Sequence, residues 1–400
     1  MKLRKILAVI LAILVMGALF SGCGDGSKTS APPVDAGGDT QQGDDQGDSQ
    51  NNDTPDQPPA EDGFELALIA DIGTIDDKSF NQGAWEGLKK YATEKNKTYE
   101  YYQPTEQSTT AYLDAIELAV KGGAKVIVTP GFLFEEPVYL AQDQYPEVKF
   151  ILLDGSPNDG DWSGGMPNYK VADNSVGVTY AEHQAGFLAG YAAVKDGYRS
   201  LGFMGGMAVP AVKKFGYGFI QGAEYAGGEL GLGSGAIAIK YFYTGGFAAT
   251  PEAQAMASSW YNDGVEVIFA CGGAVGNSVM AAAESTGNVV IGVDVDQSSE
   301  SATVITSAMK ELSVSVYDCV DDYYNNRFPG GKDIVFAAKN DGVGLPMATS
   351  KFKSFSKADY DAIYAKLAAE QIDIWPDVRN GVDVSVADIP KSITTVQEFN

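Results

Sequence analysis

The chain has 400 residues and a formal net charge of −25, from 53 Asp and Glu residues against 28 Lys and Arg residues. This excess of negative charge argues against nucleic acids and anionic membrane surfaces as partners, because both repel an acidic surface. The part after residue 63 is longer than the roughly 250–300 residues that one hydrophobic core usually supports, so we expect two domains.

Residues 1–22 have the pattern of an export signal. Basic residues near the start precede an apolar run over residues 6–20, and this run is too short for a membrane-spanning helix. The stretch Phe20-Ser21-Gly22-Cys23 resembles a bacterial lipobox, in which the cysteine is acylated and becomes the mature N-terminus. We therefore expect a lipoprotein signal peptide that ends at residue 22 and a lipid anchor on Cys23. The alternative is an ordinary signal peptide followed by an incidental cysteine.

Residues 23–63 have the composition of a linker. After Cys23 they are almost entirely Gly, Ser, Asp, Gln, Asn, Thr and Pro, so they hold too little apolar surface to offset the entropy of folding. Like charges extend such a chain further. We expect a disordered acidic linker that lifts the following domain off the membrane.

From residue 64 onward, short β-branched runs alternate with amphipathic segments of helical length. The expected strands are 65–70, 98–102, 126–129, 150–154, 200–204, 237–243, 265–270, 289–293 and 304–307. The expected helices are 79–94, 109–121, 178–195, 211–230 and 250–263. Continuous apolar strands that alternate with helices are typical of α/β folds, with parallel sheets covered on both faces.

The alternating pattern occurs twice, which predicts two lobes with a cleft and a hinge. We expect an N-terminal lobe of residues 64–173 plus about 298–335, and a C-terminal lobe of residues 174–297 plus about 336–400. In open parallel sheets, ligands bind beyond the carboxyl ends of the strands. The candidate ligand-binding residues at or after these ends are Asp71, Phe80, Asn81, Asp154, Phe215, Gly246, Asp294 and Lys310.

The remaining reactive side chains suggest no catalytic or metal centre. His183 is the single histidine and lies in a small-residue helical pattern, where a packed position is expected. Cys271 and Cys319 lie in apolar runs and resemble small buried hydrophobic residues, although a disulfide between them stays open. We expect Lys213 and Lys214 to be a solvated pair. We expect no metal and no cofactor.

Four motifs together resemble one known family. Residues 77–82 (DKSFNQ), 213–219 (KKFGYGF), 292–297 (GVDVDQ) and 306–310 (TSAMK) are similar to the basic-membrane-protein family, the PnrA-like purine-nucleoside-binding lipoproteins of bacterial ABC importers. The resemblance extends from residue 64 to about residue 345. It implies the type I periplasmic-binding-protein fold, with two Rossmann-like lobes whose parallel sheets are joined by a multi-strand hinge.

The resemblance also implies roles for the candidate residues. Phe80 and Phe215 match the aromatic residues that sandwich the base, one from each lobe. Asn81 and Asp71 match polar groups at the base edge, Asp294 the carboxylate that accepts from the ribose hydroxyls, and Lys310 the lysine beside it. Gly246 would offer a backbone contact, and Asp154 a further polar contact.

The implied partners are a nucleoside (adenosine, guanosine or inosine), the permease subunits of an ABC transporter and, through the lipid anchor, a membrane. The protein is then a monomer on the extracytoplasmic face of the cell membrane, and its linker fits a Gram-positive cell. Base stacking on aromatic rings contributes about 1–3 kcal/mol per base and tolerates any flat heterocycle. The purine preference comes from the resemblance alone.

Three other functions remain open on the sequence. An enzyme acting on nucleosides, such as a hydrolase, would need a nucleophile motif or an Asp cluster of metal-binding type near the N-terminus, and neither is found. A ligand sensor would use the same fold without transport. The same fold could also bind a sugar or another heterocycle. We expect binding without turnover.

Overall fold

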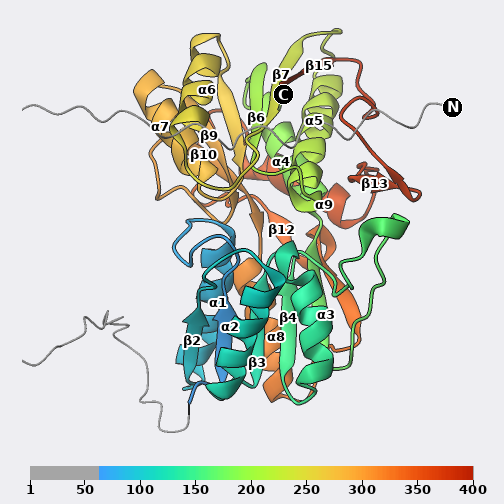
Figure 1. The fold of residues 1–400 in the computed structure, drawn as a ribbon. Coiled ribbons are helices and arrows are strands. Elements are labelled where there is room, and N and C mark those ends of the chain that lie inside the picture. Colours follow the sequence, from blue (N-terminus) through green and yellow to red (C-terminus); the bar gives the residue numbers. More distant parts are fainter. Residues whose placement is uncertain (1–62, 400) are drawn as a thin grey trace, which may run out of the picture. The chain divides into compact units, whose positions relative to one another are not determined.

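The computed structural model describes residues 63–399, and in them the chain forms two α/β lobes, each built on one main sheet (Figure 1). The predicted signal peptide, the lipid anchor on Cys23 and all of the predicted linker except its last residue lie outside the described residues. Among the described helices, none is long and apolar enough to cross a membrane.

The first lobe contains a six-stranded parallel sheet with the order β11-β5-β4-β3-β1-β2. Its strands are β1 (Leu66–Ile69), β2 (Tyr99–Tyr102), β3 (Val126–Pro130), β4 (Lys149–Leu153), β5 (Ser175–Tyr180) and β11 (Lys332–Phe336). Its helices are α1 (Phe80–Glu94), α2 (Thr109–Lys121), the 3-10 turn η1 (Phe132–Phe134), α3 (Glu135–Gln144), the 3-10 turn η2 (Trp162–Gly164) and α8 (Leu312–Tyr324). Helices α2 and α3 cover one face of the sheet, while α1 and α8 pack together on the other.

The second lobe contains a seven-stranded sheet with the order β12-β10-β9-β8-β6-β7-β15, in which the edge strand β12 alone runs antiparallel to its neighbour. Its strands are β6 (Ser200–Gly205), β7 (Ile237–Tyr243), β8 (Val267–Cys271), β9 (Val289–Asp294), β10 (Val304–Lys310), β12 (Val343–Gly344) and β15 (Thr394–Phe399). Its helices are α4 (Glu182–Lys195), α5 (Pro210–Glu229), α6 (Pro251–Asn262), α7 (Val275–Thr286), the 3-10 turn η3 (Ala338–Asn340) and α9 (Lys357–Ala368). A short hairpin of β13 (Val378–Arg379) and β14 (Val382–Asp383) follows α9.

The chain passes between the lobes three times: after β5, after β10 and after β11. These crossing segments contact one another. The Ala181 amide donates to the Phe336 carbonyl over 2.9 Å, and the Glu311 amide donates to the Gly342 carbonyl over 3.0 Å. The predicted multi-strand hinge is therefore present.

Strand pairing puts the crossings at different residues from the sequence-based lobe boundaries. Residues 175–180 were assigned to the C-terminal lobe, but as β5 they pair with β4 and extend the first sheet. Residues 304–310 were assigned to the N-terminal lobe, but as β10 they pair with β9 of the second sheet. The predicted helix 178–195 is wrong at its start for the same reason, because residues 178–180 finish β5. Hydrogen bonding to a strand distant in the sequence decides to which lobe a segment belongs. Local composition does not reveal this pairing.

Helices α4 and α5 pack backbone against backbone. A Cβ atom on Gly186 would lie 2.0 Å from the Phe215 carbonyl oxygen, and one on Gly218 would lie 2.0 Å from the His183 carbonyl oxygen. Glycine at these positions therefore permits the close approach. The result is that the first turns of both helices, with Glu182 and Lys214, are held beside the hinge.

Candidate functional site

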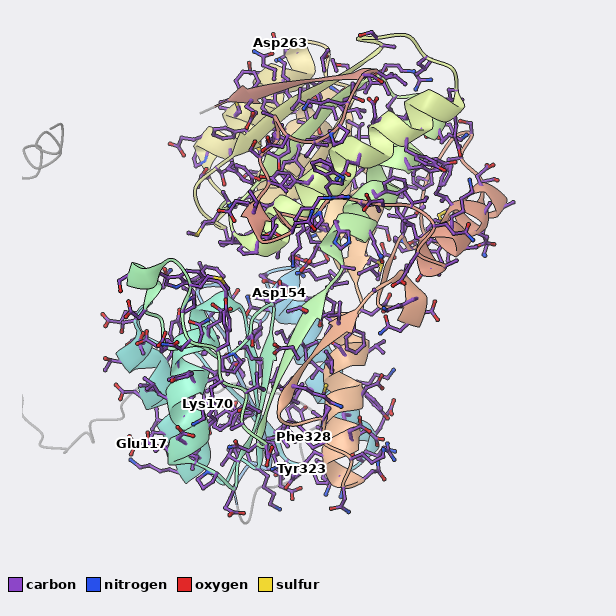
Figure 2. All side chains as sticks on the ribbon, turned by 90° about the vertical axis from the view of Figure 1, so that its right-hand side faces the viewer. Glu117, Asp154, Lys170, Asp263, Tyr323 and Phe328 are labelled. Atoms are coloured by element: carbon purple, nitrogen blue, oxygen red, sulfur yellow. The ribbon has the colours of Figure 1, made fainter. Side chains whose placement is uncertain are left out.

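Two aspartates occupy equivalent places in the two sheets. Asp154 directly follows β4 of the first lobe, and Asp294 ends β9 of the second. Both have left-handed backbone conformations, with φ values of 58° and 66°. Non-glycine residues rarely adopt this conformation, and it is often found at functional sites. Figure 2 shows Asp154 at the end of its sheet that faces the second lobe.

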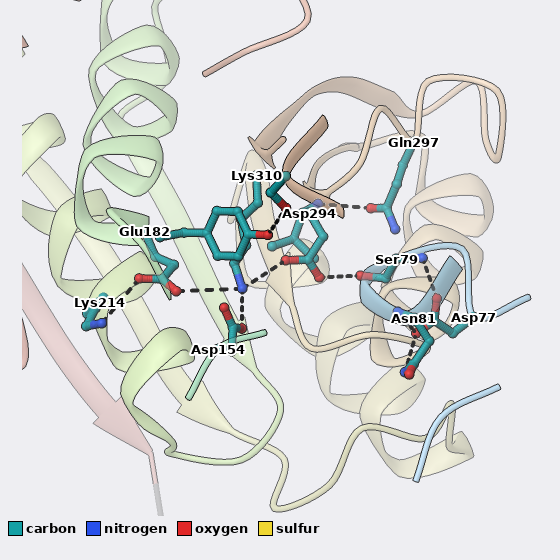
Figure 3. A network of polar contacts seen from close by, with 12 residues as sticks. Asp77, Ser79, Asn81, Asp154, Glu182, Lys214, Asp294, Gln297 and Lys310 are labelled. Carbon is teal, nitrogen blue, oxygen red and sulfur yellow. Dashed lines mark hydrogen bonds and ion pairs between the residues drawn. The ribbon is translucent and has the colours of Figure 1, made fainter. Parts of the chain in front are cut away.

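Lys310 joins these two carboxylates. It ends β10, is 3% exposed, and its Nζ atom lies 2.5 Å from Asp154 Oδ2 and 3.7 Å from Asp294 Oδ1. A third carboxylate, that of Glu182, lies 3.7 Å from the same ammonium group (Figure 3). Burial alone would lower the pKa of Lys310, but the surrounding carboxylates raise it above its usual value. Lys310 therefore stays charged, and we call Lys310, Asp154, Asp294 and Glu182 the hinge cluster.

Burial raises the pKa of Asp154 above its usual range, and the nearby Glu182 and Asp294 act in the same direction. The Lys310 ammonium opposes them. The second oxygen of Asp154, Oδ1, is buried and has no hydrogen-bond partner among the described residues. Such an orphaned acceptor costs about 1–3 kcal/mol, so this oxygen is suited to a donor supplied by a ligand.

Three aromatic rings surround the Lys310 ammonium. The ring centroids of Phe80, Tyr180 and Phe215 lie 4.7, 5.3 and 5.5 Å from Nζ. These distances allow cation–π attraction. Phe80 and Phe215 were predicted from the sequence, whereas Tyr180 was not. Its hydroxyl pairs with Ser315, which anchors the ring at the hinge.

A second polar group lies at the start of α1 in the first lobe. The Asn81 amide donates to Asp71 Oδ1 over 3.0 Å and to Asp77 Oδ2 over 3.1 Å. Burial raises the pKa values of both Asp71 and Asp77. The Asn81 Oδ1 atom is buried without a hydrogen-bond partner among the described residues, so a second acceptor is open to a ligand donor.

Two members of the charge network were not found in the sequence. Glu182 is 1% exposed at the start of α4 and lies 3.4 Å from Lys214 Nζ of α5. The expectation that Lys214 is a solvated lysine is therefore wrong, because it faces a buried carboxylate that raises its pKa. In the local sequence, burial of Glu182 was indicated only by the run of small and apolar residues that follows it.

Phe215 is buried beside Lys310, and Gly246 makes a local contact in the loop after β7. Phe215 is 1% exposed and packs edge-to-face on Phe269, with ring centroids 5.9 Å apart. The Gly246 carbonyl accepts a 3.0 Å hydrogen bond from the Thr244 hydroxyl, and no described hydrogen bond joins Gly246 to the hinge cluster. The neighbouring Phe247 is only half-buried, after β7 at the carboxyl edge of the second sheet.

The model of the family described as "ABC transporter substrate-binding protein PnrA-like" matches residues 64–377. The chain belongs to this family. The recognition made from the four motifs is thus confirmed, and the chain is a PnrA-like substrate-binding protein of the ABC transporter class.

Relatives of this PnrA-like chain carry consistent names. It is 29% identical over 330 residues to the "ABC transporter nucleoside-binding protein BmpA" of Lactococcus lactis, covering 76% of this chain and 88% of that protein. It is 30% identical over 314 residues to "Basic membrane protein A1" of Borrelia garinii, covering 77% and 87%.

Solved structures agree on the fold. A solute-binding protein of an ABC transporter system from Aeropyrum pernix has a TM-score of 0.61 at 25% identity and covers 77% of this chain and 80% of its own. A similar protein from Conexibacter woesei has a TM-score of 0.62 at 23% identity, with 78% and 99% covered. The predicted type I periplasmic-binding fold is confirmed.

The described residues of this PnrA-like chain include no group of three or more His, Cys, Asp or Glu side chains arranged to hold a metal ion. Cys271 and Cys319 are both buried free cysteines, which closes the disulfide question left by the sequence. His183 lies in α4 with a buried Nδ1 atom that lacks a hydrogen-bond partner in the described part of the chain.

Proposed function

We propose that this chain captures nucleosides, with purine nucleosides preferred, for an ABC importer, and that the ligand binds between the lobes beside the hinge cluster. The observation that carries the proposal is the position of Lys310, whose ammonium lies between Asp154 and Asp294 and 4.7 Å from the Phe80 ring. An aromatic ring next to buried carboxylates suits a ligand with one flat face and several hydroxyl groups.

The buried acceptors support a ligand rich in hydrogen-bond donors. Asp154 Oδ1 and Asn81 Oδ1 are both buried without partners in the described residues. A ribose hydroxyl or a base N–H can donate to each of them and recover the cost of the unpaired acceptor. Asp294 would accept from the ribose diol while Lys310 balances its charge, and Asp71 and Asn81 would read the base edge.

The cluster charges argue for nucleosides rather than nucleotides. Asp154, Asp294 and Glu182 bring three carboxylates within 4 Å of the single Lys310 ammonium, and the whole chain is acidic. A phosphate group would meet repulsion here, since like charges in a buried site are strongly unfavourable.

The second stacking ring needs a decision between two candidates. The family resemblance assigns Phe215, which is 1% exposed, packs edge-to-face on Phe269 and has the Lys310 ammonium 5.5 Å from its ring centroid. Phe247 is more exposed and lies on a loop after β7, so we propose it as the stronger candidate for the ring that closes on the base opposite Phe80.

The family and the export-signal pattern of residues 1–22 support a proposal for the setting in which the protein works. We propose that the protein is exported, acylated on Cys23 and held on the extracytoplasmic face of the cell membrane of a Gram-positive bacterium. There it would act as a monomer that delivers its ligand to permease subunits.

Calorimetric titration with adenosine, guanosine, inosine, cytidine, uridine and ribose tests the proposal. We expect one-to-one binding of the purine nucleosides and no binding of ribose, and we expect adenosine monophosphate to bind far more weakly than adenosine. Chromatography of the mixtures should find the nucleosides unchanged, which separates binding from hydrolysis. Binding of ribose but not of any nucleoside would replace the nucleoside by a sugar.

A further inference from the structure

Ser79 immediately precedes α1, at the N-cap position where a serine hydroxyl usually bonds to the backbone of its own helix. Here it makes no such bond. Asp77 performs the capping instead, because its carboxylate accepts from the amides of Asn81 and Gln82 over 3.0 and 3.1 Å. The Ser79 hydroxyl is therefore available for another partner.

That partner belongs to the other lobe. The Ser79 Oγ atom donates to Asp294 Oδ2 over 2.6 Å, and Ser79 is fully buried (Figure 3). Asp77 Oδ1 also accepts from the Ser79 amide over 2.8 Å, which holds the backbone of Ser79 in place. The Asp294 carboxylate thus has one oxygen held by Ser79 and the other 3.7 Å from Lys310.

A second contact holds the same segment across the lobes. The Gln297 side chain donates from Nε2 to the Lys78 carbonyl over 2.7 Å, and Lys78 adopts a left-handed φ of 61°. The other end of this amide accepts from the Val293 amide over 3.0 Å. Gln297 is 1% exposed, and a Cβ on Gly292 would lie 2.4 Å from its Oε1, so the backbone leaves space for this side chain.

We propose that Ser79, supported by Gln297, is a positioning residue that orients the Asp294 carboxylate from the opposite lobe. The proposal rests on the nucleoside function proposed above. Since the hydroxyl reaches Asp294 only when the lobes are together, closure itself sets the orientation of the carboxylate that accepts from the ribose. Removing the hydroxyl should weaken recognition of the ribose and leave recognition of the base intact.

The test compares adenosine with adenine on the full chain purified in detergent. Ser79→Ala should weaken adenosine binding about tenfold, the size expected for one charge-assisted hydrogen bond, and change adenine binding by less than about twofold. Ser301→Ala is the matched control, because Ser301 is also buried and donates to a carboxylate, that of Glu284 over 2.7 Å, within the second lobe alone. The control should leave both affinities unchanged. Equal losses for adenosine and adenine in Ser79→Ala, or no loss for either, would overturn the proposal.

A second measurement needs no ligand. Spin labels on Glu117→Cys in the first lobe and Asp263→Cys in the second, placed in a chain carrying Cys23→Ser, report the separation of the lobes (Figure 2). The double variant Ser79→Ala/Gln297→Ala should shift this distance distribution, whereas Ser301→Ala should not. An unchanged distribution would overturn the interlobe role. Absence of nucleoside binding by the unmutated chain would instead overturn the nucleoside function, and the label distances would still decide the interlobe role.

Discussion

Asp154 and Asp294 stand at the same place in two similar sheets, yet their surroundings differ. Asp154 forms the shorter ion pair with Lys310, and one of its oxygens is buried without a hydrogen-bond partner in the described part of the chain. Asp294 lies farther from Lys310 and accepts from the Ser79 hydroxyl of the other lobe. Both residues have a left-handed backbone, and both carboxylates lie within 4 Å of the Lys310 ammonium.

The difference indicates a division of labour between the lobes. The first-lobe carboxylate neutralises the lysine that ends β10, so it helps to hold the hinge together. The second-lobe carboxylate is oriented by a neutral hydroxyl, which leaves its charge available to a ligand donor. Under the proposed function both aspartates would accept from the ligand, and Asp154 would contribute the larger share of the hinge stability.

The largest effect should come from removing the cation that both aspartates share. Lys310→Met leaves the buried carboxylates of Asp154 and Asp294 without a counter-ion, whereas Glu182 keeps Lys214 at 3.4 Å. We expect the free energy of unfolding to fall by about 3–5 kcal/mol. Chemical denaturation measures this. The control is Lys357→Met, which breaks the exposed pair with Asp361 at 2.6 Å and should cost less than about 1 kcal/mol. Similar losses in both variants would contradict a buried role for Lys310.

The two aspartates themselves provide the direct comparison. Asp294→Ala should weaken nucleoside binding about 10–100-fold, as expected for lost charge-assisted hydrogen bonds, with a smaller loss of stability. Asp154→Ala should lower stability more and weaken nucleoside binding less, because it breaks the closest ion pair of Lys310 and removes one proposed acceptor oxygen, Oδ1. Titration calorimetry and denaturation of both variants separate the two effects. If the variants show the same ratio of binding loss to stability loss, the proposed division of labour is wrong.

Much of the fold could be predicted from the sequence because its signals are local. Continuous apolar runs located β1, β3, β6 and β8 to within two residues at either end, and helix 109–121 matches α2. β5 was missed, since its small residues merge into the helical pattern that follows. Strand pairing across more than a hundred residues decides which lobe holds β10, and no local pattern encodes it.

The candidate site was predicted in part, for a similar reason. Lys310 and both strand-end aspartates could be found because parallel sheets place strand ends together. The buried state of Glu182 and Lys214 could not, since whether a charge is solvated depends on the helix packed against it. The role of Ser79 was hidden because a serine before a helix usually caps that helix.

The aromatic residues allow a similar comparison between proposed ligand contacts and core packing. Phe80→Ala and Phe247→Ala should each weaken nucleoside binding by about 1–3 kcal/mol while leaving the fold largely intact. Phe215→Ala should instead lower the free energy of unfolding, since its ring is buried against Phe269. Calorimetry of the three variants, with denaturation of each as the control for folding, distinguishes these roles. Loss of binding in a stably folded Phe215→Ala, with none in Phe247→Ala, would restore Phe215 as the second stacking residue.

The smallest effect concerns His183, which follows Glu182 beside the hinge cluster. Burial lowers the pKa of His183 to about 4, against the opposing pull of Glu182. The unfolded chain therefore binds a proton at higher pH than the folded chain does, and the stability due to the neutral imidazole is full above about pH 6.5 and declines as the pH falls toward 4. Between pH 7 and pH 5 we expect the free energy of unfolding to fall by no more than about 2 kcal/mol from this group.

Since His183 is the single histidine, one imidazole NMR signal reports its titration directly. His183→Gln should remove this part of the pH dependence, and a midpoint near 6.5 in the folded protein would show that the ring is solvated and does not contribute.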